Sequence, residues 1–73
     1  MTEVTVEQPL VLIELQGAAD DFAARAKTQE SHRDRALPGT GVHHLHAHSA
    51  TLWRLAESSL RARIHDLEIA SAM

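Results

Sequence analysis

The sequence predicts an all-α protein, a hairpin of two helices preceded by an extended N-terminal arm. Two segments carry apolar side chains at helical spacing, and a segment with proline and glycine separates them. The 73 residues include one phenylalanine, one tryptophan and no cysteine. A single core in so short a chain rarely supplies more than about 3–5 kcal/mol, and disulfides are excluded. We therefore expect oligomerisation, or docking on a larger partner, to complete the fold.

The predicted arm covers residues 1–8. In this segment Val4 and Val6 alternate with polar residues, and alternation with a period of two indicates extended backbone. The β-branched residues of this segment cannot form a sheet by themselves, so the arm would need the edge of another chain or segment to pair with. The rest of the chain, residues 9–73, is predicted to be one helical hairpin.

The first helix is expected at about residues 9–27. Pro9 suits a first helical turn, because its missing N–H would have no partner there. Asp21 and Arg25 stand four residues apart on the polar side, a spacing that favours an ion pair on a helix. The apolar side of the helical wheel holds Val11, Leu12, Leu15, Ala18, Ala19, Phe22, Ala23 and Ala26.

A competing interpretation divides this segment at Gly17. A glycine inside a helix costs about 1 kcal/mol relative to alanine. In the alternative, residues 10–15 form a buried strand that ends at Gly17, and a helix begins near Ala18. The regular apolar stripe favours the single helix.

Residues 28–48 are predicted to be the connection. Pro38 disfavours helical backbone at Leu37, and the glycines that follow permit left-handed conformations. The end of the connection contains a dense histidine cluster, His43–His48, in which four of the six residues are histidine.

The second helix is expected at about residues 49–71, with Ser49 as its N-cap. A main apolar arc on the helical wheel is formed by Leu52, Trp53, Ala56, Leu60, Ile64, Leu67 and Ala70. A second, narrower stripe lies outside that arc, where Leu55, Ala62 and Ile69 recur at intervals of seven residues. A single partner helix would cover only the main arc, so the second stripe indicates a second neighbouring helix.

These helices predict the contact residues of an interface. Leu55, Ala62 and Ile69 form the second stripe, and Trp53 belongs to a residue type that is enriched among interface hot spots. For Trp53 the alternative is that it packs inside the hairpin. The expected partner is another protein or further copies of the same chain.

The histidine cluster predicts a possible metal site, because imidazole is the commonest protein ligand of transition metals. If the segment is extended, His44, His46 and His48 point to one side and could hold Zn²⁺, Cu²⁺ or Ni²⁺. If the segment is helical, His44 and His48 stand one turn apart and could chelate as a pair. If it is a loop, each imidazole is solvated and no site is formed.

Composition argues against several functional classes. The net charge is −3 and the basic residues are scattered, so we expect no nucleic-acid binding. No run of 18 apolar residues is present, so we expect no membrane span. The sequence contains no cysteine nucleophile, no GxSxG and no complete phosphate-binding loop. We therefore expect no enzymatic activity, no resident cofactor and a cytoplasmic location.

The sequence thus predicts a small non-enzymatic helical protein that acts through protein–protein contacts. Such a protein would serve as a small subunit, an adaptor, a structural component or an inhibitor. The alternative is a protein that binds or senses a transition metal through the His43–His48 cluster.

Overall fold

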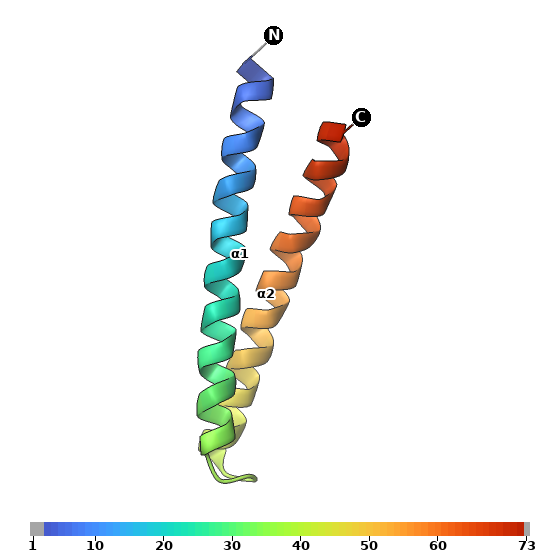
Figure 1. Cartoon of the computed structure of the whole chain (residues 1–73). Coiled ribbons are helices and arrows are strands. Elements are labelled where there is room, and N and C mark those ends of the chain that lie inside the picture. Colours follow the sequence, from blue (N-terminus) through green and yellow to red (C-terminus); the bar gives the residue numbers. More distant parts are fainter. Residues whose placement is uncertain (1–2, 73) are drawn as a thin grey trace.

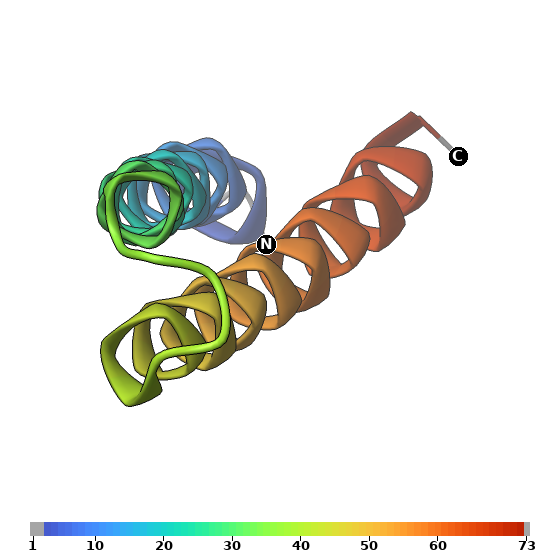
Figure 2. The same ribbon diagram turned by 90° about the horizontal axis from the view of Figure 1, so that it is seen from below.

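The computed structural model describes the backbone of residues 3–72 and the side chains of residues 10–72. These residues form two helices and no strand: α1 (Glu3–Arg35) and α2 (Gly41–Ala72). The helices run antiparallel, so both ends of the chain lie at the same end of the hairpin (Figure 1). From the connection the helices diverge toward that open end (Figures 1 and 2). The predicted all-helical hairpin is confirmed.

The prediction of an extended arm is wrong for residues 3–8, whose backbone is helical and continuous with the rest of α1. Residues 1 and 2 of that arm lie outside the described part of the chain. Two valines are too few to distinguish a period of two from a helix, and adding a residue to an existing helix gains one backbone hydrogen bond. Pro9 consequently lies within the helix, where it cannot donate to the carbonyl of Thr5.

The competing strand at residues 10–15 is also wrong, because this segment is helical and α1 passes through Gly17 without a break. A β-carbon added at Gly17 would meet no atom within 4 Å beyond the neighbouring backbone of its own helix, so alanine would fit there without a clash. The predicted ion pair forms, with Arg25 Nε 2.9 Å from Asp21 Oδ2.

The connection is shorter than predicted at both ends, because α1 continues to Arg35 instead of ending near residue 27 and α2 begins at Gly41 instead of near Ser49. Thr40 is the N-cap: its Oγ1 accepts a hydrogen bond from the backbone N–H of His43 at 3.2 Å. No proline interrupts the residues between Thr40 and Ser49, so the helix continues through the histidines. The predicted stop is confirmed at Gly39, whose φ of 84° lies in the left-handed region that glycine tolerates.

The contact between the two helices follows a heptad repeat. The residues of each helix that face the other are spaced alternately by three and four, which is the pattern of a two-stranded coiled coil. We call these residues the inner seam. In α1 they are Leu12, Leu15, Ala19, Phe22, Ala26, Gln29 and Arg33, and Ala36 continues the row just after the helix ends; in α2 they are His43, His46, Ala50, Trp53, Glu57, Leu60, Ile64 and Leu67. All of them are buried or half-buried.

The core inside this seam is small. The buried apolar residues among the described ones are three alanines and one isoleucine: Ala19, Ala26, Ala50 and Ile64. Small side chains let the helices approach closely, but they remove little apolar area from water. The hairpin is accordingly narrow, with principal extents of 57 × 16 × 12 Å.

The predicted apolar faces match the seam except at their edges. Val11 of the first stripe is 43% exposed, and Leu52 of the main arc is 52% exposed. Ala70, at the other edge of that arc, is exposed as well. A single neighbouring helix covers a narrower band than the apolar face predicted from the helical wheel. Residues at the edges of that face therefore stay exposed to solvent.

Candidate functional site

The side of α2 that faces away from α1 carries a row of exposed apolar side chains. Leu45 is 64% exposed, Leu52 52%, Leu55 61% and Ile69 48%. With the residues between them they form a second heptad row, which we call the outer stripe. The outer stripe consists of Leu45, His48, Leu52, Leu55, Ser59, Ala62, Asp66 and Ile69, all exposed. Its centre lies about 160° around the helix from the inner seam, so α1 leaves it uncovered.

The structure brings together three of the four predicted interface residues. Leu55, Ala62 and Ile69 all lie on the outer stripe. Leu45 and Leu52 belong to the same row, although the sequence predicts Leu45 in the connection and Leu52 in the main arc. Their spacing of three or four residues from His48 and Leu55 is the signal in the sequence that indicates this row.

The fourth predicted interface residue, Trp53, lies in the inner seam. Its ring centroid is 5.3 Å from that of Phe22, at an interplanar angle of 48°. The guanidinium of Arg25 lies 5.2 Å from the centroid of the indole ring, within the range of a cation–π contact. Trp53 therefore joins α1 to α2 at the middle of the hairpin.

A chain of alternating charges crosses from α1 to α2 along one edge of the seam. Asp20 of α1 pairs with Arg61 of α2 at 3.2 Å, and Arg61 pairs with Glu57 at 2.8 Å. Glu57 pairs in turn with Arg54 at 3.0 Å, and Arg54 reaches back to Glu30 of α1. Both links between the helices depend on their relative register, so the sequence alone does not reveal them.

These ion pairs perturb the acids and bases that take part. Hydrogen bonds from Arg61 and Arg54 hold the pKa of the Glu57 carboxyl below its ordinary value of 4.5. The hydrogen bond from Arg54 lowers the pKa of Glu30 in the same direction. The two carboxylates raise the pKa of Arg54. The groups are therefore stabilised in their charged forms, which suits a structural link better than proton transfer.

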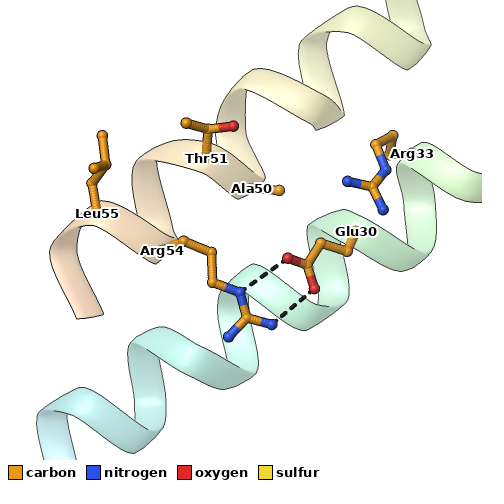
Figure 3. A pocket seen from close by; sticks show the side chains of 6 residues that line it. All are labelled: Glu30, Arg33, Ala50, Thr51, Arg54 and Leu55. Carbon is orange, nitrogen blue, oxygen red and sulfur yellow. Dashed lines mark hydrogen bonds and ion pairs between the residues drawn. The ribbon is translucent and has the colours of Figure 1, made fainter. Parts of the chain in front are cut away.

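A small groove lies beside this chain of charges, between the two helices (Figure 3). Its volume is about 240 Å³, below the roughly 300–1,000 Å³ typical of small-molecule sites. The Arg54 guanidinium is already paired with a carboxylate there, because its Nε and Nη2 donate to the two carboxylate oxygens of Glu30 at 3.0 and 2.9 Å. Arg33 is paired with Asp34 at 2.9 Å. The groove is lined by Glu30, Arg33, Ala50, Thr51, Arg54 and Leu55.

The histidine cluster is helical, and its side chains are divided between two environments. His43 and His46 are half-buried on the inner seam, and His44 and His48 are exposed. His46 Nδ1 lies 2.7 Å from Gln29 Oε1, a hydrogen bond in which the imidazole donates to the amide oxygen. The His46 ring also stacks on that of His32, with centroids 5.1 Å apart. His46 is thus engaged with α1.

The three-histidine arrangement required an extended segment, and the helix does not provide it. Residues two positions apart on a helix point about 200° apart, so His46 faces away from His44 and His48. The remaining pair, His44 and His48, stands one turn apart on an exposed side. Among the described residues, no three histidine or carboxylate side chains gather closely enough to hold a metal ion.

The described helices include none with an apolar stretch of the length needed to cross a bilayer. Comparison with protein families, with curated proteins and with solved structures finds no match to this chain.

Proposed function

We propose that this chain is a small helical interaction and assembly protein that acts through protein–protein contacts. It would serve as a small subunit, an adaptor, a structural component or an inhibitor. The observation that supports the proposal is the outer stripe, with four large apolar side chains between 48% and 64% exposed. Full burial of one Leu or Ile side chain is worth roughly 1.5–3 kcal/mol. A partner on this side of α2 would therefore gain several kcal/mol that the hairpin alone does not use.

The chemistry of the polar groups supports the same class of function. The arginines beside the groove are neutralised by carboxylates, and both perturbed glutamates are held in the charged form. A general acid or base works best with a pKa near the operating pH, and neither glutamate is shifted in that direction. The outer stripe instead offers exposed apolar surface, which favours binding over catalysis.

A photo-crosslinking amino acid placed at Leu55 tests this proposal in cells that produce the chain. The matched control carries the same group at Ala24, which is exposed on the outer side of α1. We expect adducts with protein, either a further copy or another chain, from position 55 and not from position 24. Equal labelling at both positions, or no adduct from either, would contradict the proposal.

Transition-metal binding is the second candidate, and the exposed pair His44 and His48 favours it. Imidazoles four residues apart on a helix can bind one Zn²⁺, Cu²⁺ or Ni²⁺ together, with water completing the coordination shell. Titration calorimetry with Ni²⁺ would show one site per chain that is lost in His44→Ala and in His48→Ala. His65→Ala, which changes an exposed histidine elsewhere on α2, is the control. Unchanged binding in all three variants would remove this candidate.

A further inference from the structure

The proposed function leaves the partner open, and the inference drawn here rests on that proposal. We infer that the outer stripe binds a second copy of this chain, with the two α2 helices antiparallel. The assembly has four helices, and each α2 lies between its own α1 and the α2 of the second copy. The size and charge of the side chains on the outer stripe indicate both the partner and the direction.

The antiparallel direction pairs the residues of the stripe by size and charge. A heptad stripe contains two sets of residues, and within each set the residues are seven positions apart. In an antiparallel helix pair, each set faces the other set on the partner helix. When the two stripes overlap along their whole length, which is about 36 Å, all eight positions find a partner. The facing pairs are then Leu45 with Ile69, His48 with Asp66, Leu52 with Ala62, and Leu55 with Ser59. Leu52 and Leu55 each meet a small residue, and the only acidic residue of the stripe meets its only histidine.

A parallel pair would place each residue opposite its own copy. Asp66 would then face Asp66, and His48 would face His48, within the contact. Like charges placed directly opposite each other are destabilising. The large side chains would also meet in pairs while Ser59 and Ala62 met each other. Both charge and volume therefore favour the antiparallel direction.

The residues that flank the outer stripe leave room for a close approach. Helix pairs commonly carry charged side chains at these flanking positions, where they select the partner. Here one flank holds Ser49, Ala56, Arg63 and Ala70, and the other holds His44, Thr51, Ser58 and His65. Arg63 is the only Lys, Arg, Asp or Glu on either flank, and in the antiparallel register it lies opposite Ser49. A second copy thus meets no repulsion from this chain's own flanks.

The exposed area of the hairpin matches what such a dimer would bury. The accessible surface is 5,475 Å², whereas monomeric proteins of 8.0 kDa have about 4,450 Å² by the usual scaling with mass. The excess of about 1,000 Å² per chain is close to the roughly 800 Å² that each partner buries in a standard interface. The radius of gyration, 16.7 Å, likewise exceeds the about 11 Å of a compact chain of this length.

Two single-cysteine variants, Leu52→Cys and Ala62→Cys, test the partner and the direction together, because the natural chain has no cysteine. The positions are ten residues, or about 15 Å, apart along the helix, so in a parallel pair position 52 of one copy and position 62 of the other would be too far apart for a disulfide. Under mild oxidation we expect the mixture to form mostly the mixed disulfide, resolved by mass from the two symmetric ones. Strong self-crosslinking of Leu52→Cys alone would overturn the antiparallel direction.

A charge exchange tests the His48–Asp66 pair by sedimentation equilibrium. His48→Asp alone would place two acidic residues opposite each other twice per dimer, and we expect the dissociation constant to rise about tenfold. The double variant His48→Asp/Asp66→His should restore dimer formation, since antiparallel pairing again sets an imidazole against a carboxylate. Failure of the double variant to recover, with normal helix content by circular dichroism, would overturn the register.

The mass of the purified natural chain separates this inference from the proposed function. A dimer at micromolar concentration supports the inference. A monomer that nevertheless yields adducts with a different protein from position 55 overturns the second copy as partner and leaves the proposed function standing. A monomer that yields no such adducts removes both.

Discussion

The outer sides of the two helices differ sharply, although both helices belong to the same hairpin and have nearly the same length. At the positions that correspond to the outer stripe of α2, α1 carries a largely polar row with one large apolar side chain. That row consists of Leu10, Glu14, Gly17, Asp21, Ala24, Thr28, Ser31 and Arg35, all exposed. The outer stripe of α2 has three leucines and one isoleucine in the same number of positions.

This difference shows that the exposure of apolar side chains on α2 is not a general property of a small chain. Single exposed apolar residues are common on protein surfaces. A row that repeats every three or four residues on one helix, and not on its neighbour, is instead typical of a surface that another helix covers. α1 thus resembles the solvent side of an assembly, and α2 its interior.

The largest expected effect comes from lysine on the outer stripe. In Leu55→Lys/Ile69→Lys we expect the dissociation constant of the dimer to rise at least about a hundredfold, because two buried apolar side chains are lost from each copy. Lysine favours helix almost as strongly as leucine, so helix content should stay near that of the natural chain. Sedimentation equilibrium and circular dichroism measure the two quantities.

The matched control is Ala24→Lys/Ser31→Lys on the outer row of α1. The same charge is added there to the side that we expect to face solvent, so the mass in solution should not change. If both double variants lose dimer formation equally, the contrast between the two helices has no functional meaning.

A loss of similar size, but of a different kind, is expected on the inner seam. Trp53→Ala removes the contacts with Phe22 and Arg25 and should lower the free energy of unfolding by about 3 kcal/mol, at the low end for such changes because the ring is only half-buried. Trp53→Phe should lose less. Chemical denaturation followed by circular dichroism measures both variants. A stability loss in Trp53→Ala no larger than that in Trp53→Phe would mean that the seam does not depend on this layer.

Acidification should loosen the hairpin through the charges that link α1 to α2. The pKa values of Glu30 and Glu57 lie below the ordinary value of 4.5, so the folded state binds these protons more weakly than the unfolded state. Their stabilisation is complete above about pH 5 and is lost as the pH falls through the lowered values. Thermal unfolding between pH 6 and pH 3 measures the trend.

Glu30→Gln should flatten that dependence on pH, because the amide cannot titrate. Glu14→Gln, at an exposed position on the outer row of α1, is the control and should keep the slope of the natural chain. A natural chain whose melting temperature is constant down to pH 3 would show that these ion pairs add nothing to stability.

The smallest expected effect is a gain in stability from Gly17→Ala. Gly17 lies in the middle of α1 on the outer row, and an added β-carbon would meet no neighbour within 4 Å. Alanine should therefore stabilise the helix by about 1 kcal/mol, measured by denaturation. The mass in solution should stay the same, and a change in it would mean that a partner also contacts α1.

The number of helices and the break between them at Pro38 and Gly39 were predictable because local rules determine them. Apolar spacing defines a helix face, and proline with glycine ends it. The starts of the helices were not predictable by the same rules. Val4 and Val6 are compatible with both a strand and a helix, so they do not show where α1 begins. Thr40 and Ser49 are both acceptable N-caps, and α2 begins at the earlier one because no proline interrupts the residues between them.

The candidate site was predictable in part for a related reason. The intervals of seven between Leu55, Ala62 and Ile69 were visible in the sequence, but Leu45 and Leu52 join that row only when the helix is known to begin at Gly41. The partners of His46 and Arg54 could not be predicted, since Gln29 and Glu30 reach them only through the register between the helices. Interactions across the hairpin depend on how the two helices are aligned, and local patterns in the amino-acid sequence do not determine that alignment.

Trp53 gives the protein a spectroscopic property that follows from its place in the seam. It is the only tryptophan, and the chain has no tyrosine, so ultraviolet fluorescence arises from one layer between Phe22 and Arg25. Closure of the hairpin changes the surroundings of that ring, whereas a second copy would bind on the opposite side of α2. The emission of the unlabelled protein should therefore report on folding, and the inferred pairing on the opposite side of α2 should leave it unchanged.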